Sequence, residues 1–92
     1  MAKVKVKTST GFECTVDTDL ANNMELVDAL AEVDEGKSLA VSKVVSIVLG
    51  DQKNAVYDHV REKDGRVPID AVMNEVTDIL NNTGSHGEGK NS

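Results

Sequence analysis

Aromatic residues are nearly absent from this sequence. Phe12 and Tyr57 are the only two among 92 residues, and tryptophan does not occur. A core must therefore be built from many contacts among valine, leucine and isoleucine rather than from a few large rings. Acid–base catalysis needs carboxylates in a desolvated pocket, and a chain this small with two aromatics can hardly enclose one. We therefore expect a protein that is not an enzyme.

Cysteine occurs once, at Cys14, which excludes an internal disulfide. The two histidines, His59 and His86, are far from Cys14 and from each other in sequence, and no pair of these residues has the spacing of a metal site. We expect no metal and no other cofactor. Cys14 is predicted to be a small core residue, with a functional thiol as the less favoured alternative.

Positive charge is also scarce. The chain has 10 lysines and arginines against 16 acidic residues, a net charge of -6 and a pI near 4.7. Binding to nucleic acid or to an anionic membrane needs clustered basic residues, so neither is expected. No hydrophobic run approaches the roughly 18 residues of a membrane span, and residues 3–7 alternate lysine with valine instead of forming a signal-peptide core. We expect a cytoplasmic protein whose partner is another protein.

Two short segments near the N-terminus alternate polar and apolar residues. The alternation covers residues 3–8 and again residues 12–17, and Ser-Thr-Gly at residues 9–11 supplies turn chemistry between them. A period of two is typical of a strand with one buried face. The segments together predict a β-hairpin. Because a lone hairpin is only marginally stable in water, helices must cover its apolar face.

An acidic helix is predicted next, with Asn22 or Asn23 as its N-cap and Gly36 beyond its end. Residues 17–35 contain seven acids and neither lysine nor arginine. At about 100° per residue, four of these acids lie within an arc of about 80°: Glu25, Asp28, Glu32 and Glu35. The stripe is interpreted as a solvated face, and alternatively as a docking surface for a basic partner. The stripe residues assigned to protein binding are Glu25, Asp28 and Glu32.

Two further helices are predicted in the middle of the chain. Residues 41–49 have a broad apolar side at helical spacing, with Ser38 as the cap and Gly50 where a helix-ending residue is expected. The many valines of this segment favour a strand by propensity, but the spacing favours a helix. Residues 52–63 predict a helix with a narrow apolar stripe, capped by Asp51.

The last helix, residues 68–81, is predicted to be the most regular amphipathic segment. Pro68 suits the first helical position. Six apolar residues lie within about 120° of one another on this helix, and such a stripe either enters the core or receives a partner helix. The residues assigned to protein binding here are Ile69, Val72, Met73, Val76 and Leu80.

These elements predict a single α+β domain over residues 1–81. Its N-terminal β-hairpin packs on a small bundle of about four helices. Residues 82–92 contain no hydrophobic residue and three glycines, so they cannot offset the entropy that ordering costs. They predict a disordered polar tail.

Three segments, taken in order, resemble a known family. They are residues 24–34 (MELVDALAEVD), residues 48–53 (VLGDQK) and residues 64–72 (DGRVPIDAV). Over roughly residues 3–80, the chain resembles the small tail-assembly proteins of long-tailed phages and prophages of Gram-positive bacteria. No segment carries a catalytic signature.

The resemblance implies a tail assembly chaperone. Such proteins keep the long, aggregation-prone tape-measure protein soluble until tail-tube subunits polymerise around it. The expected partner is therefore the tape-measure protein and/or a tail-tube subunit, together with self-association of the chain. Two other functions stay open: a structural tail or connector component of the virion, and an acidic inhibitor of a DNA-binding protein.

Overall fold

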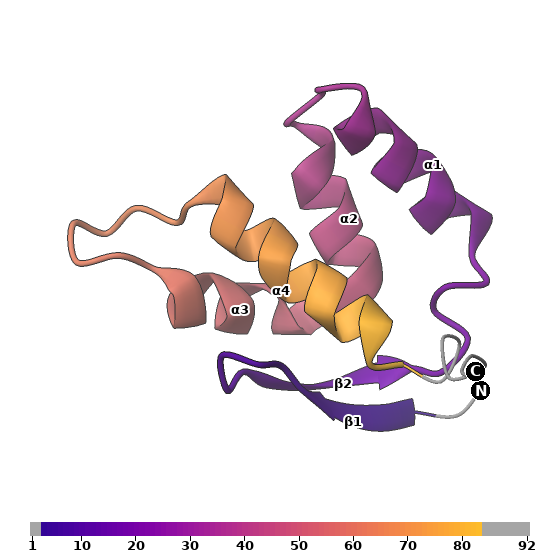
Figure 1. Ribbon diagram of the computed structural model, residues 1–92, viewed down its shortest axis with the longest axis horizontal. Coiled ribbons are helices and arrows are strands. Elements are labelled where there is room, and N and C mark those ends of the chain that lie inside the picture. The colour runs from indigo at the N-terminus through magenta and orange to yellow at the C-terminus, as the bar shows by residue number, and fades with distance from the viewer. Residues whose placement is uncertain (1–2, 84–92) are drawn as a thin grey trace.

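A two-stranded hairpin and four α-helices make up the computed structural model, which describes residues 3–83 (Figure 1). The hairpin lies along one side of the helices, and α4 slopes down towards it in this view. The predicted α+β fold with an N-terminal hairpin is confirmed. In chain order the elements are β1 (Lys3–Lys7), β2 (Glu13–Asp17), α1 (Met24–Asp34), α2 (Ala40–Leu49), the short 3-10 helix η1 (Gly50–Gln52), α3 (Lys53–Val60) and α4 (Ile69–Asn81).

The hairpin has the register that its alternation predicts. The strands are antiparallel, with Val6 opposite Cys14 and Val4 opposite Val16. The turn between them contains Gly11 at φ +96°, a conformation in which glycine avoids the steric cost that a side chain would incur. Because side chains alternate across a strand, the apolar set shares one face and is turned towards the helices, while the lysines of β1 are exposed.

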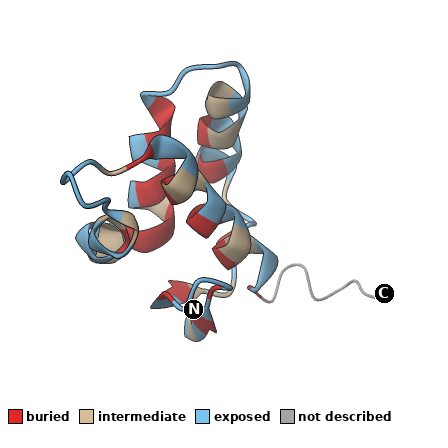
Figure 2. Cartoon of the chain, turned by 60° about the vertical axis from the view of Figure 1, so that its left-hand side comes forward, coloured by how far each residue is buried: buried red, intermediate tan, exposed pale blue. Residues whose placement is uncertain are grey.

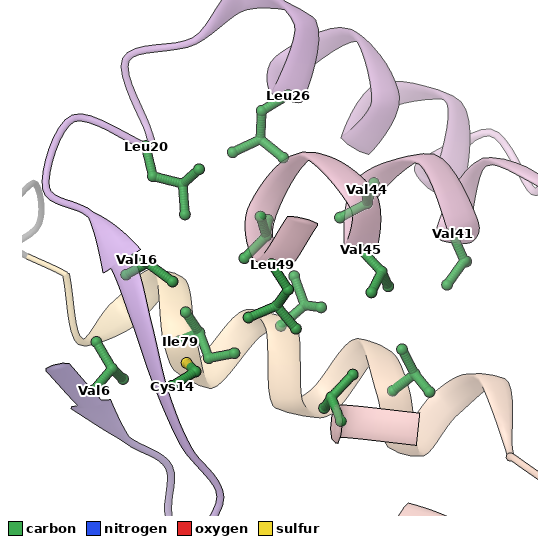
Figure 3. Close-up of a cluster of buried hydrophobic side chains, with 14 of the residues drawn as sticks. Val6, Cys14, Val16, Leu20, Leu26, Val41, Val44, Val45, Leu49 and Ile79 are labelled. Atoms are coloured by element: carbon green, nitrogen blue, oxygen red, sulfur yellow. The ribbon is translucent and has the colours of Figure 1, made fainter. Parts of the chain in front are cut away.

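The core is aliphatic, as the composition predicts. Its centre is α2, which packs against α1, α4 and β2. Val44 and Val45 of this helix are fully buried. Figure 3 shows the labelled side chains of α2, the hairpin and α4 converging, with the sulfur of Cys14 beside Ile79. Helical spacing therefore prevails over the strand propensity of the valines, because the helix buries its whole apolar side.

Helix ends were predicted with mixed success. Asn23 caps α1, since its side chain accepts a hydrogen bond from the Glu25 N–H at 2.9 Å, and Gly36 follows the helix at φ +95°. The predicted Ser38 cap is wrong, because α2 begins at Ala40 and has no side-chain cap. Backbone carbonyls of residues 37 and 38 accept from the first N–H groups instead, at 2.9 and 3.1 Å.

The helix predicted over residues 52–63 is shorter than expected, and the Asp51 cap is wrong. Asp51 lies inside η1, and α3 ends at Val60. After it the chain is extended at Arg61 and forms a tight turn, in which Glu62 N–H donates to Arg66 O at 2.8 Å. This turn satisfies backbone groups that a longer helix would otherwise have bonded.

The last helix agrees closely with its prediction. It ends at Asn81 as predicted, but it begins at Ile69, so Pro68 is the extended N-cap residue and not the first helical residue. The folded body continues for two more residues, since Asn82 bonds back to Asp78 and Thr83 is only 2% exposed. The predicted disorder is therefore wrong for these two residues. Residues 84–92 of the predicted tail lie outside the described residues.

Candidate protein-binding surface

The apolar stripe of α4 divides between core and surface. Val72 and Val76 are 3% and 0% exposed, so both mainly support the fold. Met73 and Leu80 are partly buried against the core. Ile69, at the beginning of the helix, is 56% exposed. Figure 2 shows the same division along the helices, with buried inner faces and exposed outer ones.

Ile69 borders an apolar groove that the sequence did not predict. The groove lies where the beginnings of α2 and α4 meet the end of α3, and it encloses about 410 Å³. Leu39, just before α2, forms another wall and is 91% exposed. We call this surface the α2–α4 groove. Its apolar lining is Leu39, Val41, Tyr57, Val67, Ile69 and Val72, and its polar rim is Ser38, Ser42 and Arg61.

Helical spacing of apolar residues does not reveal Leu39. Leu39 occupies the N-cap position of α2, so it is outside the apolar face that packs into the core. The signal that could have found it is a large apolar residue in a polar connection, between Lys37-Ser38 and the helix. A fully exposed leucine leaves about 1.5–3 kcal/mol of burial free energy unused. That free energy is available to a partner.

The acidic stripe lies on α1, apart from the groove. Glu25 and Asp28 are exposed, whereas Glu32 is half-buried and lies 3.8 Å from the Lys43 ammonium of α2. The described structure places no residue of α1 in the lining of the groove. The eight residues assigned from the sequence therefore do not form one site.

A polar cluster joins the hairpin turn to α3 and α4. The Thr10 hydroxyl donates to Glu75 Oε2 at 2.6 Å. Since a hydroxyl has one proton, the 2.9 Å contact between Thr10 Oγ1 and His59 Nε2 requires the imidazole to donate. Glu75 is 3% exposed, and its Oε1 has no hydrogen-bond partner among residues 3–83. The cluster fixes the turn in place.

Two ionisable groups near this turn have shifted pKa values. Asp78 accepts a hydrogen bond from the Ser9 N–H at 2.6 Å, which stabilises its charged form and lowers its pKa. Burial raises the pKa of Cys14, and the negative charge of Glu75 raises it further. The thiol therefore stays protonated at neutral pH, and a protonated thiol is a poor nucleophile.

The described residues contain neither a metal cluster nor a helix that could cross a membrane. Between residues 3 and 83, no three side chains of His, Cys, Asp or Glu are placed to hold a metal ion. In the same part of the chain, no helix combines the length and hydropathy that a membrane crossing requires.

Comparison with known proteins identifies no relative. The chain matches no protein-family model, no curated protein and no solved structure.

Proposed function

We propose that this protein is a tail assembly chaperone-like protein of long-tailed phages or prophages of Gram-positive bacteria. In this proposal it acts in the host cytoplasm and binds the tape-measure protein and/or tail-tube subunits during tail morphogenesis. The observation that carries the proposal is the α2–α4 groove, with Leu39 91% exposed at its edge. Isolated leucines on a surface are ordinary, but a second exposed large side chain, Ile69, lines the same groove.

A groove of this kind is suited to an amphipathic helix. Such a helix presents apolar side chains at i, i+3, i+4 and i+7, and these enter an apolar channel between helices. The tape-measure proteins of the resembled family are long and helical. The hydroxyls of Ser38 and Ser42 and the Arg61 guanidinium surround the apolar lining and can bond the polar face of an incoming helix.

The energetics suit a partner that must later be released. Because Leu39 is 91% and Ile69 56% exposed, covering both contributes about 2–4 kcal/mol in total, before the cost of association is subtracted. This is a weak, reversible contact, as a chaperone requires when tube subunits replace it. Self-association through the same groove would compete with the partner.

The test is co-purification of the full chain with the tape-measure protein that this proposal expects to be encoded beside it. We expect Leu39→Ser and Ile69→Ser to weaken capture at least about tenfold, because each removes an apolar wall. Val27→Ser is the matched control, since Val27 is 46% exposed but lies on α1, away from the groove. Circular dichroism of all three variants checks that the fold is kept.

Failure of the wild-type chain to capture the tape-measure protein rejects the proposal, and so does equal capture by the Ser variants. The two alternative functions have their own signatures. A structural tail or connector component would form stable rings or tubes and be found in purified virions. An acidic inhibitor would displace DNA from a host protein, and it would depend on Glu25 and Asp28, which are exposed on α1.

A further inference from the structure

The two-stranded sheet has two outer edges, and the described structure closes only one of them. On the β2 edge, the Gln52 side chain takes the place of a neighbouring strand. The Thr15 N–H donates to Gln52 Oε1 at 2.9 Å, and Gln52 Nε2 donates to the Thr15 carbonyl at 2.7 Å. An amide side chain thus satisfies both backbone groups of Thr15.

The register determines which backbone groups face the other edge. Lys5 is opposite Thr15, and the Thr15 groups point away from β1, towards Gln52. Lys5 and Thr15 therefore form a non-hydrogen-bonded pair, in which the groups of both residues point outward. Hydrogen-bonded and non-hydrogen-bonded pairs alternate along the ladder, so Thr8 and Phe12, three residues further on, should be a hydrogen-bonded pair. They are, because Thr8 N–H donates to Phe12 O at 2.8 Å.

Every second residue of β1 consequently directs its N–H and C=O away from β2. These residues are Lys3, Lys5 and Lys7. Among residues 3–83, no hydrogen bond reaches their outward groups from any side chain or backbone segment. Unpaired groups in a row along a strand are a template for one more strand.

The side chains of the same lysines add a charge requirement. All three are exposed, and within the described chain none forms an ion pair. On the opposite face of β1, Val4 is only partly buried. A strand added at this edge would therefore lie beside three ammonium groups on one face and beside an incompletely covered valine on the other.

We propose that the outer edge of β1 binds an extended segment of a partner protein in which acidic residues alternate with apolar ones. The acidic residues pair with the lysines across the new ladder, and the apolar residues extend the buried face over Val4. The strand β2 already pairs with β1 in this way, because its Glu13 and Asp17 lie opposite Lys7 and Lys3. This inference does not depend on the tape-measure protein or on the α2–α4 groove.

A second copy of this chain is a poor occupant of the edge. Pairing β1 with another β1 would place lysine beside lysine, which is destabilising in a sheet. Pairing it with the β2 edge of another copy would require Gln52 to leave Thr15. The lysines thus deter self-pairing and at the same time select an acidic partner strand.

The probe is a capped synthetic peptide, Glu-Val-Glu-Ile-Glu-Val-Glu, titrated into the full 92-residue chain and followed by NMR and amide hydrogen exchange. We expect at least about tenfold slower exchange at the Lys5 amide when the peptide is saturating. The amides of Val6 and Thr15 serve as internal controls, because both are already bonded in the free chain. Two control peptides are used: one with lysine for each glutamate, and one with the same composition in scrambled order.

Variants of Lys5 test the backbone and the charge separately. Lys5→Pro removes an N–H that the intrachain ladder does not use, and it should weaken peptide binding at least about tenfold. Lys5→Gln keeps that N–H and removes one charge pair, and it should weaken binding about two- to fivefold. Because Lys5→Gln leaves the backbone intact, its result stands even where the proline variant does not fold.

Four outcomes overturn the proposal. The first is equal binding of the lysine or scrambled peptide, and the second is a peptide footprint away from β1. The third is unchanged affinity in Lys5→Gln. The fourth is an already protected Lys5 amide in the free chain, which would mean that another element covers the edge. Binding of the alternating acidic peptide alone, with protection at Lys5 and weakening by added salt, supports it.

Discussion

The Thr10 hydroxyl donates a 2.6 Å hydrogen bond to Glu75 Oε2, joining the turn of the hairpin to a helix 65 residues away in sequence. Glu75 is 3% exposed, and its other carboxylate oxygen has no partner among residues 3–83. The single bond from Thr10 therefore supports a buried carboxylate. Since a two-stranded hairpin is marginal alone, this contact also fastens the hairpin to the helices.

Thr10→Val should lower the free energy of unfolding by about 1–3 kcal/mol, because it leaves Glu75 Oε2 buried without its donor. Thr10→Ser retains the hydroxyl and should cost less than about 1 kcal/mol. Urea unfolding of the wild type and both variants measures the difference. If the valine and serine variants have equal stability, the hydrogen bond does not have the role assigned to it.

The two isoleucines of α4 should respond very differently to the same substitution. Ile79 is fully buried and Ile69 is 56% exposed. Ile79→Ala should therefore cost about 2–5 kcal/mol, the lost transfer free energy plus the cavity left behind. Ile69→Ala should change stability by no more than about 0.5 kcal/mol, since its surroundings are already solvated. Similar losses in denaturant unfolding would contradict the burial on which the groove assignment depends.

The Asp78 carboxylate should make stability depend on acid pH. The Ser9 hydrogen bond lowers the pKa of Asp78. The stability that the charged carboxylate contributes is therefore present above the unfolded-state pKa and is lost as pH falls through the folded-state pKa. Asp78→Asn keeps an oxygen that accepts from Ser9 but removes the charge. Urea midpoints measured from about pH 6 down to about pH 2 should show the wild type losing its advantage over the variant. Parallel curves would refute this assignment.

The Cys14 thiol should be both slow to react and sensitive to alkaline pH. Burial and the charge of Glu75 raise its pKa. The protonated thiol's contribution to the free energy of unfolding is therefore complete below the ordinary thiol pKa, and it is lost as pH rises through the folded-state pKa. Labelling by a thiol reagent should be slow in native buffer and fast in urea. Cys14→Ala should remove the part of the stability loss at alkaline pH that is due to this thiol. Fast labelling of the native chain would show that the thiol is accessible.

Local pattern was sufficient for most of the fold. Alternation of lysine and valine predicted β1, and it also predicted the face on which Val6 and Cys14 meet. The Asn22-Asn23 pair and the glycine at residue 36 placed the ends of α1, and the structure selects Asn23 as the cap. Each of these signals is a short-range preference for a backbone conformation or for one face of an element. Such preferences need no knowledge of what is packed on the other side.

The candidate surfaces could be predicted only in part. The stripe of α4 was recognised, but its buried middle and exposed beginning have the same periodicity. Ser38 and Asp51 were predicted as caps because of residue type, while backbone groups met those needs instead. The exposed Leu39 and the Gln52–Thr15 bonds depend on how separate elements dock. No local window contains that information.

By itself the sequence determined the elements of this protein, their order, their apolar faces and an acidic, almost aromatic-free composition. These follow from spacing and residue type, because backbone preferences act over a few residues. Only the tertiary structure decided, over residues 3–83, which apolar side chains stay exposed, which sheet edge receives no hydrogen bond and which carboxylate is buried. Burial and hydrogen bonding are properties of contacts between residues distant in sequence, and such contacts exist only once the chain has folded.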